Sequence, residues 1–154
     1  MSELVKNPIT IVLAFDAQNC NPNGDPDNDN NPRQFEDGIG YMSSESIKYK
    51  IRSYIRDKVL FDGLEKNSHA LYCSPDTFSI ERSVKECLEP IIGKKTKGIP
   101  DDQQLEAYKE LCRYYYDTRM FGLVNTSYSN CSLLSRIKGA CQVSMPMSLS
   151  LIHI

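Results

Sequence analysis

Carboxylate side chains gather in one polar stretch of the chain, where their spacing could support metal-dependent chemistry. The acids between residues 16 and 37 are Asp16, Asp25, Asp27, Asp29, Glu36 and Asp37. Asp16, Asp25 and Asp27 follow an apolar segment that favours a strand, and carboxylates at a strand end suit metal-assisted phosphodiester cleavage. However, no histidine or lysine lies within this stretch. Loops rich in Asp and Asn are also common as solvated turns, so both interpretations stay open.

The same stretch has the spacing of a calcium-binding loop. The side chains at loop positions 1, 3, 5, 7, 9 and 12 would be Asp25, Asp27, Asp29, Asn31, Arg33 and Glu36. Against this, Asn30 stands where the loop needs glycine for its sharp turn. Pro32 occupies the position of the short strand that follows, and it has no backbone amide to pair there. The preceding residues, NCNPNG, cannot form an entering helix. A calcium site is therefore a weaker alternative.

Basic side chains form a ridge on the next segment. Residues 43–59 have apolar residues at helical spacing, and Ser43 or Ser44 can cap the helix. The expected buried face consists of Ile47, Ile51, Tyr54, Ile55 and Val59. Beside it, Lys48, Arg52 and Arg56 recur every four residues. Serines at the helix start and cations one turn apart could bind the phosphates of a nucleic-acid backbone. From the residues alone, a solvated basic face is the simpler interpretation.

Composition fits one ordinary globular domain. The chain has 154 residues, 40% of them hydrophobic and 25% charged, and a net charge of −2 that argues against a basic field over the whole surface. Six cysteines form no C-x-x-C pair and only two histidines are present, so we expect free thiols and no metal site. No segment resembles a membrane span or an export signal, and we expect a cytoplasmic protein that contacts no membrane.

The remaining elements indicate an α+β protein. We expect a buried strand at 8–16, a long loop at about 18–41, an insertion at about 60–100 and a helix at 103–116. The helix at 103–116 should bury Leu105, Tyr108, Leu111, Cys112 and Tyr115. Inside the insertion we expect a short strand within 72–80, a short helix at 83–92 and an exposed loop after it. A last strand is expected within 137–147.

The final six residues, LSLIHI, match the translation of a transposon end that serves as a sequencing adapter. We therefore expect residues 1–148 to form the domain and residues 149–154 to be a non-native tail. The alternative is a genuine apolar C-terminal strand.

Four sequence motifs resemble those of one protein family. They are NPNGDPD with NPR (21–27 and 31–33), SSESIKYKIRSYI (43–55), DTRMFG (117–122) and KGACQV (138–143). In this order they resemble the N-terminal half of the backbone subunits of type I CRISPR Cascade complexes, the CRISPR-associated protein seven family, especially its I-B and I-C branches.

The resemblance implies a fold and a function. The fold would be a modified RRM-like, ferredoxin-like palm with inserted finger and thumb segments, truncated at its C-terminus. Copies of such a subunit stack along a CRISPR RNA, beside other Cascade subunits, and present the guide to a target DNA strand. No catalysis is expected. Related type III backbone proteins cut RNA with a loop aspartate, so a metal-dependent ribonuclease is the alternative.

The resemblance also implies the RNA-contacting residues. The expected contacts are Ser44, Ser46, Lys48 and Arg52 on the first helix, Asn19, Asn23 and Arg33 in the preceding loop, and Arg119, Lys138 and Gln142 in the later motifs.

Overall fold

The computed structural model describes residues 6–63, 69–73 and 80–151. The chain divides into two compact units, one formed by residues 1–41 and 147–154 and the other by residues 42–146. Helices and small antiparallel sheets occur together, which agrees with the expected α+β class. None of the helices in the described ranges is long and apolar enough to cross a membrane.

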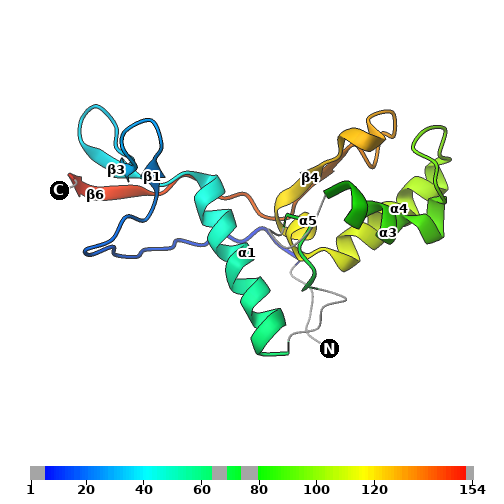
Figure 1. Ribbon diagram of the computed structural model, residues 1–154, viewed down its shortest axis with the longest axis horizontal. Coiled ribbons are helices and arrows are strands. Elements are labelled where there is room, and N and C mark those ends of the chain that lie inside the picture. The colour runs from blue at the N-terminus through cyan, green and yellow to red at the C-terminus, as the bar shows by residue number, and fades with distance from the viewer. Residues whose placement is uncertain (1–5, 64–68, 74–79, 152–154) are drawn as a thin grey trace. The chain divides into compact units, whose positions relative to one another are not determined.

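The first unit is built from two short antiparallel pairings (Figure 1). Strand β1 (Gly24–Asp25) pairs with β2 (Asn31–Pro32), and β3 (Ile39–Tyr41) pairs with β6 (Met147–Leu151). Asp29 and Asn30 close the first hairpin in the left-handed region, with φ of 47° and 59°. Asp and Asn tolerate this conformation better than most residues. The segment expected as a long loop at 18–41 therefore contains the short strands β1, β2 and β3.

The expected buried strand at 8–16 is wrong. Residues 8–16 pair with no strand among the described residues, and their side chains are exposed. Ile11 is 83% exposed and Val12 is 90% exposed. The prediction rested on β-branched and apolar composition, which describes residues that fit a half-buried sheet but supplies no pairing strand.

The second unit contains four described helices. They are α1 (Ser44–Phe61), α3 (Ile80–Ile92), α4 (Asp101–Tyr114) and α5 (Tyr116–Phe121). The amide of Ser46 donates to the Ser43 hydroxyl at 3.1 Å, which confirms Ser43 as the cap of α1. The helices expected at 83–92 and 103–116 are confirmed with shifted ends, because both start two or three residues earlier.

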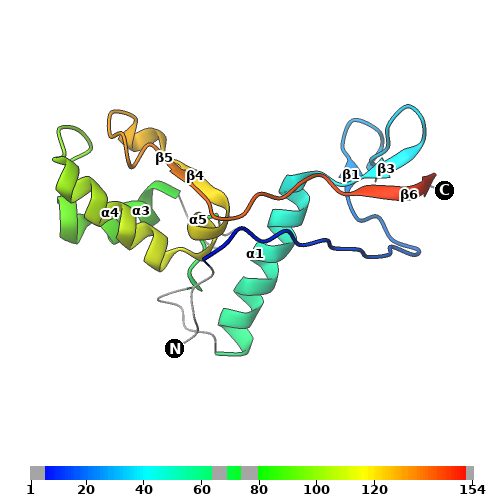
Figure 2. The ribbon, with the colours of Figure 1, turned by 180° about the vertical axis from the view of Figure 1, so that it is seen from behind.

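The core of this unit lies where α3 packs against α4 (Figure 2). Its fully buried side chains include Leu88 of α3, Leu111 of α4 and Leu134. The expected helix faces need two corrections, since Leu105 is 44% exposed and Tyr54 is 60% exposed. On α4 the buried positions are instead Gln104, Ala107 and Leu111, so the buried stripe is rotated away from Leu105.

A two-stranded hairpin follows α5. Strand β4 (Gly122–Val124) pairs with β5 (Arg136–Lys138), and the 3-10 turn η1 (Thr126–Tyr128) lies between them. A Cβ on Gly139 would lie 2.3 Å from the carbonyl carbon of Phe121, so only glycine lets this segment approach α5. Of the strand expected at 137–147, residues 137 and 138 lie in β5 and Met147 begins β6, whereas residues 139–146 form no strand.

Two further expectations fall partly outside the described residues. The short strand expected within 72–80 lies mostly in the undescribed 74–79, and Tyr72 and Cys73 belong to no strand. Of the expected tail, residues 149–151 form the end of β6, which pairs with β3, and residues 152–154 are not described.

Candidate RNA-binding surface

Arg52, an expected RNA contact on α1, binds another part of its own unit. Its Nε donates to a carboxylate oxygen of Asp117 at 2.9 Å, and its guanidinium lies 5.2 Å from the centre of the Phe121 ring. Asp117 is 1% exposed and also accepts the backbone amides of Tyr72 and Cys73, at 2.8 and 3.0 Å. Arg52 therefore links α1 to the 70–73 segment and to α5.

The start of α1 already holds a carboxylate. Glu45 lies in the first turn, where the helix dipole favours negative charge, and the Ser44 hydroxyl donates to it at 2.8 Å. This hydrogen bond is the main cause that lowers the pKa of Glu45. Lys48 is half-buried, and Ser46 gives its amide to the Ser43 cap. Lys48 and Arg52 are the two cations on α1 that were expected to contact RNA. Unlike Arg52, which binds Asp117, Lys48 forms no hydrogen bond or ion pair with a described residue.

The expected contacts Asn19, Asn23 and Arg33 lie in the first unit. Arg33 stands 3.6 Å from a carboxylate oxygen of Asp25, and a hydrogen bond with Tyr41 is the main cause that raises its pKa. Asn19 is exposed with a left-handed φ of 51°, and the carbonyl of Asn23 accepts the amide of Arg33.

The carboxylates considered for metal chemistry take part in hairpin structure. Asp25 accepts the amide of Asp27 on its side chain and the amides of Asn28 and Asn30 on its carbonyl. Asp25 and Asn31 thus lie on two paired strands joined by a turn, and not in a loop between two helices. In the described ranges, no three Asp, Glu, His or Cys side chains form a group suited to a metal ion.

An open, basic hollow of about 440 Å³ lies in the second unit. Four cationic residues line it: Lys109, Arg113, Arg119 and Lys138. The described residues of the lining include no carboxylate, and Tyr108, Cys112, Gly139 and Ala140 complete it. Two expected RNA contacts, Arg119 and Lys138, therefore share one site. Gln142 is exposed four residues beyond Lys138, outside the lining.

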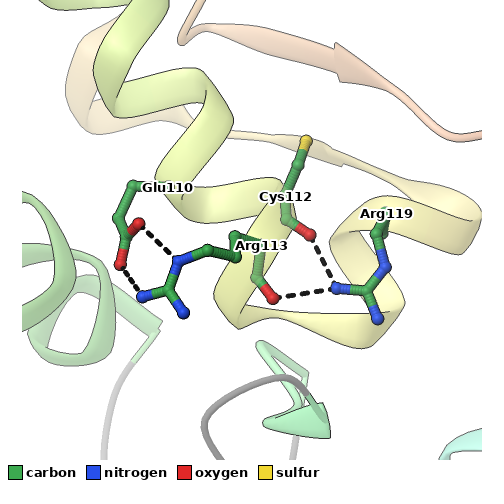
Figure 3. Close-up of polar contacts among 4 residues, drawn as sticks. All are labelled: Glu110, Cys112, Arg113 and Arg119. Carbon is green, nitrogen blue, oxygen red and sulfur yellow. Dashed lines mark hydrogen bonds and ion pairs between the residues drawn. The ribbon is translucent and has the colours of Figure 1, made fainter. Parts of the chain in front are cut away.

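The walls of this hollow come from α4, α5 and the segment around the end of β5, and Arg119 of α5 contacts the other two elements. Its Nη1 donates to the carbonyls of Cys112 and Arg113 at the end of α4, at 2.7 and 2.9 Å (Figure 3). Its own carbonyl accepts the amide of Ala140 beyond β5, at 3.0 Å. One residue of α5 thus fixes both the end of α4 and the segment that follows Lys138.

Several of these residues were missed in the sequence. Tyr108 and Cys112 were assigned to the core, although each is only half-buried, and Lys109 and Arg113 were not noticed. Lys109 and Arg113 are four residues apart on a helix, which is the same signal that singled out Lys48 and Arg52. Asp117 was also missed. Its partner Arg52 lies 65 positions away, so no local spacing in the sequence connects the two.

Comparison with known proteins gives one family. The model of the family described as CRISPR-associated protein Cas7 matches residues 7–154. A CRISPR-associated protein Cas7 from Haloferax volcanii is 38% identical over 60 residues, which are 38% of this chain and 16% of that protein. The aligned part is thus well under two thirds of the relative's length. On the family match, the chain belongs to the CRISPR-associated protein Cas7 family.

Proposed function

We propose that this chain contributes to a non-catalytic backbone subunit of a CRISPR effector complex and binds the sugar–phosphate backbone of a guide RNA. The observation that carries the proposal is the basic hollow, where Arg119 and Lys138 meet Lys109 and Arg113. Cations that gather in one concave surface attract phosphates without reading bases. Such a surface needs no net positive charge on the chain, which is −2.

The family membership supports finer proposals. We assign the subunit to a type I Cascade complex of the I-B or I-C kind, with an RRM-like palm that carries finger and thumb insertions. Its partners would be CRISPR RNA, a target DNA strand paired with the guide, neighbouring copies of itself and other Cascade subunits. A cytoplasmic location follows from these partners.

Among the other expected contacts, the roles differ by geometry. Lys48, Ser44 and Ser46 on α1, Asn19, Asn23 and Arg33 in the first unit, and Gln142 stay as proposed RNA contacts. For Arg52 we propose a bracing role that reaches RNA only through the position of α1, because Asp117 holds its guanidinium.

Co-expression with a CRISPR array tests this function. The chain would be purified in EDTA, and its bound RNA would be sequenced. We expect intact RNA from the array to be bound to the wild-type chain. It should be enriched over the RNA that is bound to the Arg119→Glu/Lys138→Glu variant. Recovery of no array RNA would contradict the proposal. Magnesium-dependent cleavage of that RNA, abolished by Asp25→Asn, would favour the ribonuclease instead.

A further inference from the structure

The four cationic side chains of the hollow differ in the hydrogen bonds and ion pairs that they form within the chain. Arg119 donates to the carbonyls of Cys112 and Arg113 (Figure 3). Carbonyls at a helix end lack intrahelical donors and carry the negative end of the helix dipole. The guanidinium also lies 5.6 Å from the centre of the Tyr116 ring. The charge of Arg119 therefore stabilises the end of α4.

Arg113 is held by the neighbouring Glu110. Its Nε donates to one carboxylate oxygen at 2.8 Å and its Nη2 donates to the other, which makes a two-pronged ion pair (Figure 3). The hydrogen bond from Arg113 is the main cause that lowers the pKa of Glu110. Much of the charge of Arg113 is thus offset before any ligand arrives.

Lys109 and Lys138 are in a different position. Both are exposed, and neither side chain forms a hydrogen bond or ion pair with a described residue. They approach the hollow from two elements, since Lys109 lies on α4 and Lys138 ends β5. The backbone of Lys138 is fixed by its pairing with Gly122 and by the close approach of Gly139 to Phe121.

We propose that Lys109 and Lys138 bind phosphate groups of the RNA backbone in the hollow, and that Arg119 is a positioning residue that holds the two lysines at their separation. The inference rests on the proposed function and divides the work among the residues of its site. An ammonium group is a compact point charge that suits a single phosphate oxygen. The guanidinium of Arg119 is instead bound to the end of α4, and its backbone carbonyl accepts the amide of Ala140 in the segment after β5.

The salt dependence of RNA binding separates contact from positioning. The full chain would be titrated into a fluorescent single-stranded RNA between about 50 and 300 mM salt. Each phosphate contact with a single strand contributes about 0.7 to the slope of log affinity against log salt. Lys109→Ala/Lys138→Ala should reduce that slope by about 1.4, without a change in melting temperature. The matched control Lys94→Ala/Lys95→Ala removes the same charge from an exposed loop and should leave the slope unchanged.

Arg119→Ala should behave differently from the lysine pair. We expect weaker RNA binding with the wild-type salt slope, together with a melting temperature lower by about 3 °C as the end of α4 loses its donor. A lysine-pair variant with the wild-type slope would overturn the inference. So would an Arg119→Ala variant that loses slope and keeps its melting temperature, because Arg119 would then be a contact itself.

Pyrophosphate as a second probe keeps this inference distinct from the proposed function. It should raise the melting temperature of the wild-type chain and not that of Lys109→Ala/Lys138→Ala. If pyrophosphate gives this pattern but RNA does not bind, the guide-RNA function fails and the phosphate site stands. If RNA binds but Lys109→Ala/Lys138→Ala changes neither the salt slope nor the effect of pyrophosphate, the proposed phosphate site is wrong and the guide-RNA function stands. If neither ligand binds, both are wrong.

Discussion

The carboxylate of Asp117 accepts three hydrogen bonds from residues that are far apart in the sequence. The donors are Arg52 on α1 and the backbone amides of Tyr72 and Cys73. Because Asp117 is 1% exposed, its charge depends on these donors for stabilisation. Arg52 is accordingly more important for holding α1 in place than its position on a basic ridge suggests.

Loss of this carboxylate should destabilise the second unit strongly. Asp117→Ala leaves the mostly buried Arg52 guanidinium and two amides without their acceptor, and we expect the free energy of unfolding to fall by about 3 kcal/mol. Urea denaturation measures the change. As a control, Asp57→Ala removes the exposed partner of Arg56 and should cost less than about 1 kcal/mol. Equal losses in the two variants would show that Asp117 has no special role.

Cys87 should be the slowest thiol to react among those that are not fully buried. Burial, followed by the nearby charge of Glu110, raises its pKa to about 11. At pH 8 the thiolate, which is the reactive form, is therefore scarce. We expect iodoacetamide to modify the exposed Cys20 and Cys141 well before Cys87, as followed by peptide mass spectrometry. Alkylation of Cys87 as fast as of Cys20 would contradict this environment.

Spacing in the sequence identified cations that share one helix face, but it did not identify the ion-pair partner of each cation. Lys48, Arg52 and Arg56 recur every four residues, yet Arg52 binds Asp117 and Arg56 binds Asp57. The partner Asp117 lies 65 positions after Arg52, a distance over which helical periodicity carries no information. The later motifs contributed Arg119 and Lys138, which line one hollow, and their contact with RNA stays a prediction.

Among the elements, the helices were the most predictable. Ser43 caps α1 as expected, and the apolar spacing located α3 and α4 to within three residues. Strands were harder because pairing depends on distant segments. The apolar segment 8–16 has the composition of a strand but no partner among the described residues, whereas β3 pairs with β6 more than 100 positions away.

The exposed segment 8–16 should limit the solubility of this chain. Ile11 and Val12 are 83% and 90% exposed, and an unpaired apolar segment of high β-propensity can pair with other copies. We expect Val12→Lys to raise the concentration at which light scattering detects aggregates, with the melting temperature unchanged. By contrast, Leu88→Ala in the core should lower the free energy of unfolding by about 2–5 kcal/mol. A melting temperature that falls in Val12→Lys would show that the segment packs against the fold.

At the scale of the whole molecule, charge is unevenly distributed between the two units. The acids Asp25, Asp27, Asp29, Glu36 and Asp37 all belong to the first unit, whereas the basic hollow belongs to the second. The net charge of −2 averages over both and hides the hollow. Local concavity and charge, rather than the overall balance, therefore identify the surface proposed for RNA.

Photo-crosslinking gives the most direct test of the central claim that RNA lies in the basic hollow. The full chain would be irradiated with a CRISPR RNA that contains 4-thiouridine, and the crosslinked peptides would be identified by mass spectrometry. We predict crosslinks in the peptides that carry Tyr108 with Lys109 and Lys138, and their loss when Lys109 and Lys138 are both replaced by alanine. Crosslinks confined to α1 or to residues 19–33, with none from the hollow, would contradict the account.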